Sequence, residues 1–108
     1  MDSNKSFNQQ CYDLLRQIPA GKVVTYADIA HQLGSKAYQA VGNAMANNPD
    51  PIIVPCHRVV NSNGNIGKYA LGTDKKIALL KQEGIVIDEK IENARVVDLG
   101  NQRHIFKI

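Results

Sequence analysis

The sequence of 108 residues has no tryptophan, only two cysteines and no long apolar run. Two cysteines cannot build the disulfide framework of a small secreted domain, so we expect a cytoplasmic protein. The polar start, Met1 to Lys5, lacks the apolar stretch of a signal peptide, and no segment has the length of a membrane span. We therefore expect no membrane association, and one domain, residues 1–108, with a single modest core.

The charged fraction of 21% is ordinary for a soluble globular protein, without a strong excess of either sign. The net charge is +3, which is compatible with nucleic acid as a partner but does not require it. Zinc sites need paired ligands at short spacing, and Cys11 and Cys56 stand too far apart to form such a pair. We expect neither a metal nor an organic cofactor.

Apolar residues recur at helical spacing in four segments. The first follows Ser6 and places Cys11 on its apolar face, which predicts a core cysteine. The second opens with Thr25 and Asp28, a capping box, and closes at Gly34. The third runs from Lys36 to about Ala46 with Ser35 as its cap, and the fourth runs from a cap at Asp74 to Gly84.

Short extended pieces surround these helices. We expect them at 52–54, 59–60, 85–87, 95–97 and 105–106. Asn63 and Gly64 are the residue pair that two-residue β-hairpin turns favour, which predicts a hairpin here. A hairpin that follows two helices joined by a tight turn corresponds to the wing of a winged helix-turn-helix. We predict a mainly α domain of winged helix-turn-helix type, with a short β-hairpin and an extended C-terminal segment.

The most informative segment is Pro55-Cys56-His57-Arg58. A cysteine is a good nucleophile at neutral pH when its surroundings favour the thiolate. Here an apolar run, Ile52 to Val54, leads into a polar corner, which favours a buried site. A cysteine in such a protein is more often a small core residue, and that alternative stays open for Cys56 taken alone.

Five segments surround and include this motif. They are, in order, Ile18 to Tyr26, Ala40 to Met45, Asn48-Pro49 with Ile53 to Val60, Gly64 to Gly67 with Tyr69, and Leu79 to Gly84. Together they resemble the DNA-binding and active-site domain of the methylated-DNA–protein-cysteine methyltransferases, the 6-O-alkylguanine repair proteins. The resemblance covers about residues 7 to 87. It implies a single-turnover enzyme that flips an alkylated guanine out of duplex DNA and transfers the alkyl group to its own cysteine.

The resemblance also implies roles for individual residues. Cys56 would be the nucleophile, His57 the base acting through a water molecule, Glu83 the acid that orients the imidazole, and Asn48 a brace of the active-site turn. Tyr26, Tyr69, Val54 and Pro55 would line the base pocket, and Arg58 would be mainly a structural brace. Each has a plainer alternative: Glu83 as a surface acid, Tyr26 as packing, Tyr69 as an exposed loop aromatic, and Asn48 as an ordinary turn residue.

The third helix carries small residues and few groups that read base edges, which suits close approach in a minor groove. By resemblance, the expected partner is double-stranded DNA bearing alkylated guanine, bound by a monomer. The residues expected to contact it are Thr25, Tyr26, Lys36, Ala37, Tyr38, Gln39, Ala40, Gly42, Asn43 and Arg58. The sequence departs from the family at Gln39, where family members commonly have an arginine that fills the gap left by the extruded base.

Three other functions compete with this one. Alkyltransferase-like proteins are short lesion sensors that recruit other repair proteins, and they typically have tryptophan where Cys56 stands. Only six residues precede Phe7, so we expect the N-terminal domain of most full-length relatives to be absent. A cysteine hydrolase using Cys56, His57 and Glu83 is disfavoured because its nucleophile and base would be sequence neighbours. A transcription regulator would need more base-reading side chains on its recognition helix.

Overall fold

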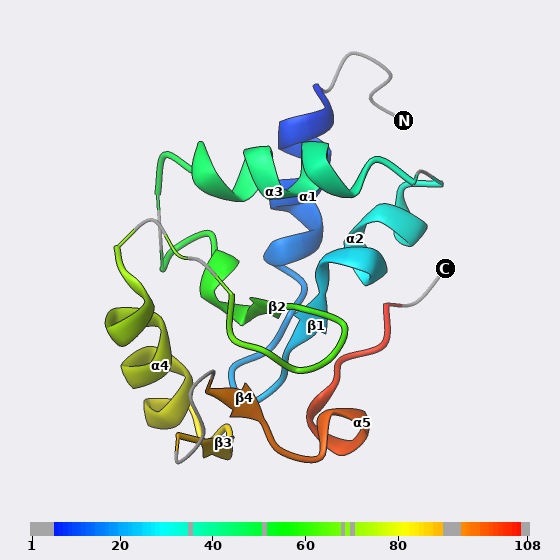
Figure 1. The fold of residues 1–108 in the computed structure, drawn as a ribbon. Coiled ribbons are helices and arrows are strands. Elements are labelled where there is room, and N and C mark those ends of the chain that lie inside the picture. Colours follow the sequence, from blue (N-terminus) through cyan, green and yellow to red (C-terminus); the bar gives the residue numbers. More distant parts are fainter. Residues whose placement is uncertain are drawn as a thin grey trace.

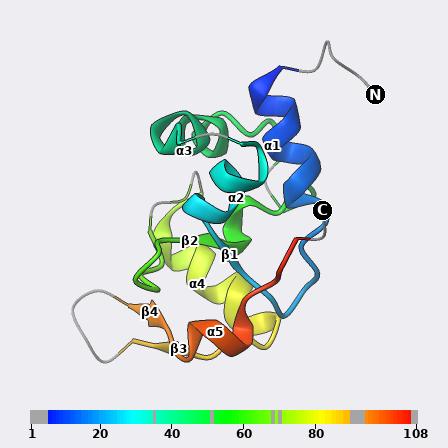
Figure 2. The same cartoon turned by 90° about the vertical axis from the view of Figure 1, so that its right-hand side faces the viewer.

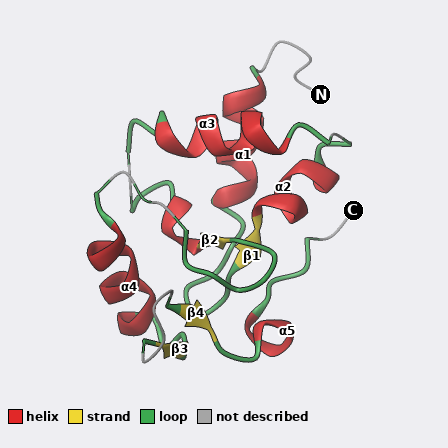
Figure 3. Cartoon of the chain, viewed as in Figure 1, coloured by secondary structure: helices red, strands yellow, loops and turns green. Residues whose placement is uncertain are grey.

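The computed structural model describes residues 6–34, 36–50, 52–67, 69, 71–89 and 94–106. The ribbon in Figure 1 is mostly helical, with short strands between the helices. The helices are α1 (Phe7–Leu15), α2 (Tyr26–Gln32), α3 (Tyr38–Ala46), the 3₁₀-helix η1 (Cys56–Arg58), α4 (Thr73–Gln82) and α5 (Leu99–Gln102). The strands are β1 (Val24–Thr25), β2 (Val59–Val60), β3 (Ile87–Asp88) and β4 (Arg95–Val96). The predicted mainly α class with minor β structure is confirmed, as Figure 3 makes visible.

Strands β1 and β2 run parallel and separate two apolar clusters. Because successive strand residues point to opposite faces, Val24 and Val59 enter one cluster while Val23 and Val60 enter the other. The first cluster lies among α1, α2, α3 and η1, and the second lies toward α4 and β4. Figure 2 shows β1 and β2 between these two parts of the molecule. The pair therefore fixes η1, which directly precedes β2, against both clusters.

Helices α2 and α3 pack together as the expected helix pair. The predicted capping box is confirmed: Thr25 Oγ1 accepts the amide of Asp28, and Asp28 accepts the amide of Thr25. Gly34 follows the helix with φ +67°, the left-handed conformation expected after a helix end. Helix α3 begins at Tyr38 with Ala37 as its N-cap, two residues later than predicted. The predicted cap Ser35 lies outside the described residues.

The expected hairpin around Asn63 and Gly64 is wrong in its pairing. The turn exists, since the amide of Asn61 donates to the carbonyl of Asn65 and that of Gly64 donates to Asn61. Its return arm pairs with β4 and not with β2, through Ile66 to Ala94 and Val96 to Gly64. The antiparallel hairpin of this fold is formed instead by β3 and β4.

Three further expectations need correction. Residues 52–53 form an exposed turn rather than a buried strand, with Ile52 at φ +84° and Ile53 78% exposed. Helix α4 is capped by Gly72 and not by Asp74, which lies in its first turn. The segment after β4 contains the unpredicted helix α5, and Val23 exchanges backbone hydrogen bonds with Gln102 and His104. No helix within the described ranges is long and apolar enough to cross a membrane.

Candidate active site

Cys56 is the first residue of η1 and its side chain is almost enclosed, at 3% exposure. Its amide donates to the carbonyl of Val54 at 2.7 Å. Asn48 fixes the same carbonyl through its side-chain Nδ2 at 2.8 Å, while its Oδ1 accepts the amide of Asp50 at 3.0 Å. The buried Asn48 thus ties together the turn that leads to the cysteine. This rigid turn holds Sγ in one place.

The ionisation of Cys56 is governed by opposing effects. Burial raises the pKa of its thiol above the ordinary value. A hydrogen bond from the Asn48 side chain and the positive charge of Lys76 both oppose this rise in pKa. A base that removes the thiol proton is therefore needed for attack at neutral pH.

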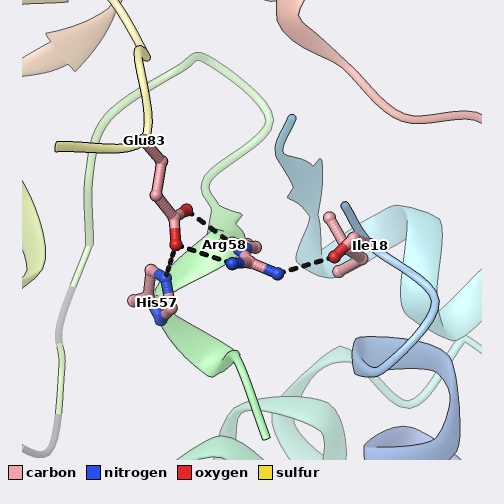
Figure 4. Close-up of polar contacts among 4 residues, drawn as sticks. All are labelled: Ile18, His57, Arg58 and Glu83. Atoms are coloured by element: carbon pink, nitrogen blue, oxygen red, sulfur yellow. Dashed lines mark hydrogen bonds and ion pairs between the residues drawn. The ribbon is translucent and has the colours of Figure 1, made fainter. Parts of the chain in front are cut away.

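Behind Cys56, three side chains form one hydrogen-bonded cluster, drawn in Figure 4. Glu83, the C-cap residue of α4, accepts from His57 Nε2 at 3.0 Å. The same carboxylate receives Arg58 in a two-point contact, Nε to Oε1 at 2.9 Å and Nη2 to Oε2 at 2.6 Å. Arg58 Nη1 also donates to the carbonyl of Ile18 at 2.7 Å, at the end of the first helical region. The cluster joins η1, α4 and the chain after α1.

His57 is fully buried and suited to act as a base. Burial is the main cause that lowers the pKa of its imidazole, although the hydrogen bond to Glu83 acts in the opposite direction. A neutral ring that donates through Nε2 keeps a lone pair on Nδ1. Nδ1 is buried and has no hydrogen-bond partner among the described residues. It is therefore available to take a proton.

Burial alone would raise the pKa of Glu83, but hydrogen bonds from Arg58 and His57 hold that pKa below its usual range. Glu83 is thus ionised at neutral pH and fixes the tautomer of His57. Within the described residues, no group of three or more His, Cys, Asp or Glu side chains is arranged to hold a metal ion.

A cleft of about 680 Å³ opens in front of Cys56. One wall is α3; the others are Tyr26 of α2 and the segment between η1 and α4. The residues that line it are Tyr26, Gln39, Gly42, Asn43, Met45, Ala46, Cys56, Asn61, Gly67 and Tyr69. Its volume is within the range of pockets that hold small organic ligands.

Gly67 lies in the wall of this cleft. Its φ of +78° is a conformation that favours glycine, and an added Cβ would lie 3.5 Å from both Tyr26 Oη and Asn61 Nδ2. Tyr69, on the same segment, packs its ring edge-on to His57, with centroids 6.3 Å apart. Its hydroxyl is buried and has no hydrogen-bond partner in the described part of the chain. Two tyrosines and one cysteine therefore face a common space.

The structure brings together Cys56, Tyr26, Tyr69, Gln39, Gly42 and Asn43 at the cleft, with Asn48, His57 and Glu83 behind it. It does not support four of the expected contacts with base or DNA. Val54 and Pro55 are buried and do not line the cleft. Thr25 is buried with its hydroxyl in the helix cap, and the guanidinium of Arg58 is committed to Glu83 and Ile18.

The remaining expected DNA contacts lie along the start and outer side of α3. Lys36, Ala37 and Tyr38 are exposed, and Ala40 is half-buried. Tyr38 does not face the cleft: its hydroxyl lies 3.3 Å from His31 Nε2, with the two rings edge-on. Gln39 is the side chain of this region that borders the cleft.

Sequence reasoning missed five residues of this site. Four of them line the cleft, namely Met45, Ala46, Asn61 and Gly67, and Lys76 is buried beside η1. Only Lys76 left a signal in the sequence. It stands four residues before Leu80 and seven before Glu83, so all three share one face of α4.

Residues 6–85 match the family described as "6-O-methylguanine DNA methyltransferase, DNA binding domain". A methylated-DNA–protein-cysteine methyltransferase of Methanosarcina acetivorans is 48% identical over 79 residues, which are 72% of this chain and 51% of that protein. The chain spans between about a third and a half of the first curated relatives that it matches.

Two solved structures show the same architecture. The OGT protein of Mycobacterium tuberculosis, in complex with DNA, superposes with a TM-score of 0.71 and 42% identity, over 74% of this chain and 50% of that one. Atl1 of S. pombe, in complex with damaged DNA containing O6-carboxymethylguanine, superposes with a TM-score of 0.77 and 32% identity. That match covers 94% of this chain and 95% of the other.

Proposed function

The chain belongs to the family of DNA-binding domains of 6-O-methylguanine DNA methyltransferases, and on that premise we propose that it transfers an alkyl group from O6 of guanine in DNA to Sγ of Cys56. One observation carries the proposal: a buried cysteine lies at the inner end of an open cleft, with a neutral histidine and its carboxylate behind it. A core cysteine such as Cys11, by contrast, has no cleft and a pKa raised by burial to about 11.

The chemistry is a displacement at a saturated carbon. The thiol loses its proton to His57 Nδ1 through a water molecule, and the thiolate attacks the alkyl carbon. The bond from that carbon to O6 breaks, and its electron pair stays with guanine. Guanine gains one proton, which balances the proton that the thiol lost. The product is a stable thioether, so each molecule reacts once.

The substrate must reach this cleft from a stacked duplex. A base inside a double helix has to be rotated out before a side chain can attack its substituent. We infer that α3 lies against DNA, that Gln39 and Asn43 border the point of entry, and that the Tyr26 hydroxyl donates to the extruded base. Support comes from the exposed, charge-free α3 along one wall of the cleft.

The test is incubation of the intact protein with duplex DNA that contains one 6-O-methylguanine. We expect the protein mass to increase by one methyl group in place of one hydrogen, and peptide mapping to place it on Cys56. Cys56→Ser should abolish the increase, whereas the matched variant Cys11→Ala should retain it. A methyl group found equally on Cys11 would refute the assignment.

A second function is favoured by the match to Atl1, which extends over nearly the whole chain. Under it the protein is a lesion sensor that holds the alkylated base without transferring the alkyl group. The same experiment separates the two functions. A sensor would bind the lesion duplex more tightly than the undamaged one, with no change in protein mass and an intact lesion after release.

A further inference from the structure

Lys76 is a lysine in the interior of the protein. Its side chain is 0% exposed, and Nζ donates to the carbonyl of Val59 at 2.7 Å. Val59 directly follows η1, so this contact attaches α4 to the helix that begins with Cys56. A buried ammonium costs several kcal/mol of desolvation unless a partner offsets it. Packing alone would be served better by an apolar side chain of the same length.

The charges around Lys76 are arranged in a specific way. The charge of Lys76 acts on two ionisable groups of η1, Cys56 and His57. Glu83, the C-cap residue of α4, and Tyr69, in the turn before α4, both contact His57. Glu83 is paired with Arg58 through two hydrogen bonds, so those two charges offset one another. His57 is held neutral by its burial, which lowers its pKa. The thiol of Cys56 is the group whose ionised form the Lys76 charge stabilises.

We propose that Lys76 is a positioning residue that supplies the positive charge against which the Cys56 thiolate forms. This inference rests on the proposed function in one respect, that Cys56 is the nucleophile. Lys76 keeps its proton throughout and forms no bond to the substrate. The thiol proton leaves through His57, and the ammonium stabilises the negative charge that remains on sulfur. The Val59 carbonyl fixes Nζ of Lys76, so that the ammonium charge is in place before the alkylated guanine enters the cleft.

The pKa of Lys76 sets the pH range of this effect. Burial lowers it to about 8, and the nearby thiolate acts to raise it. The two groups are therefore coupled, and they titrate as a pair. Below a pH of about 8 the ammonium is present to support thiolate formation. Without Lys76, one of the effects that lower the pKa of the Cys56 thiol would be lost. Burial would then raise this pKa further, and the thiolate would form only at higher pH.

The experiment measures the rate at which iodoacetamide alkylates Cys56 between pH 6 and 10, in the full chain and without DNA. Cys11→Ala serves as the background, so that Cys56 is the one reactive cysteine, and peptide mapping identifies the product. Lys76→Met removes the charge at similar length. Lys75→Met is the matched control, because Lys75 is the neighbouring lysine on α4 and is exposed.

We expect Lys76→Met to slow alkylation selectively below a pH of about 8, where Lys76 carries its charge in the parent protein. An opposite charge at close range shifts a pKa by about one to two units, so the rate at pH 7 should fall about ten- to hundredfold, while the plateau at high pH is retained. Lys75→Met should follow the parent profile. A Lys76→Met profile that matches the parent below pH 8, or one lowered equally at every pH, would show a purely structural role and overturn the proposal.

A second measurement does not depend on how Lys76→Met folds. The titration of Lys76 is followed by NMR through its Cε and Nζ signals, in the parent protein and in Cys56→Ser. Since the thiolate raises the pKa of Lys76, the ammonium should deprotonate at lower pH in Cys56→Ser. Identical titrations would contradict the proposal. Neither readout uses alkylguanine, so the failure of methyl transfer from DNA would refute the proposed function and leave this inference standing.

Discussion

Replacing Glu83 with glutamine tests the cluster behind the cysteine most directly. The change keeps the size of the side chain and removes one negative charge. Three hydrogen bonds end on this carboxylate, two from Arg58 and one from His57. A glutamine has one carbonyl oxygen, and its amide group would face donors. At least one donor of Arg58 or His57 is then left without an acceptor.

The magnitude follows from the burial of the pair. Removing one partner of a buried ion pair costs about 3–5 kcal/mol. The side chains of Arg58 and Glu83 are each 16% exposed, so water reaches part of the pair. We therefore expect Glu83→Gln to lower the free energy of unfolding by about 2–4 kcal/mol. Urea unfolding followed by circular dichroism at pH 7 measures this loss.

Glu89→Gln is the matched control. Glu89 also forms an ion pair, with Lys81 at 2.7 Å, but the side chain of Glu89 is 45% exposed and that of Lys81 is 54% exposed. An ion pair in that setting contributes about 0–1 kcal/mol. If the two glutamine variants lost equal stability, the cluster would be no more than a surface contact, and the reasoning from burial would be wrong.

The dependence of the unfolding free energy on pH tests the same cluster independently. The folded pKa of Glu83 is lowered, so its contribution to stability is present above the unfolded pKa of about 4.3 and is lost as the pH falls below it. The folded pKa of His57 is also lowered, so stability begins to fall below its unfolded value of about 6.5. We expect the parent protein to lose stability in both ranges. Glu83→Gln should show a smaller loss at the lower pH, where Asp28, whose pKa is also lowered, still contributes.

Three further predictions concern the cleft and its supports. Gln39→Arg adds a positive charge beside the cleft, so it should tighten DNA binding and steepen the salt dependence by about one unit of slope; an unchanged slope in fluorescence titrations would place residue 39 away from the phosphates. Asp28→Asn weakens the contacts of Asp28 with Arg103 and the Thr25 amide, and thermal unfolding should show a loss of about 1–2 kcal/mol. Asp74→Asn, on the exposed first turn of α4, is the control for that loss. Tyr69→Phe removes a buried hydroxyl without a partner among the described residues, so the unfolding free energy should change by less than about 0.5 kcal/mol, and a loss above about 1 kcal/mol would reveal a hidden partner.

Local features of the fold could be predicted because each depends on residues close in the chain. The capping box of Thr25 and Asp28 spans one helical turn, and Gly34 ends the same helix. The stripe that buries Cys11 repeats within α1. The identity of the candidate nucleophile was equally accessible, because it rests on four consecutive residues and the spacing of motifs around them.

Other features are set by segments that meet only in three dimensions. Ile52 and Ile53 read as a buried strand, but the hydrogen bonds of Asn48 and Asp50 bend that segment into an exposed turn. Asn63 and Gly64 do form a turn, yet the arm that follows it pairs with a distant segment, Asn65 with Arg95, and not with β2. The β-propensity of a segment does not indicate which of several distant segments it will pair with.

The sequence by itself determined which segments form α1 to α4 and which cysteine is the candidate nucleophile, because helical periodicity and side-chain chemistry act over a few residues. Only the tertiary structure decided which charges face that cysteine. Arg58 meets Glu83 across 25 positions and Ile18 across 40, and Lys76 is buried against Val59 rather than solvated. Burial depends on how distant segments pack, and burial is the main cause that shifts the pKa values of Cys56, His57 and Lys76.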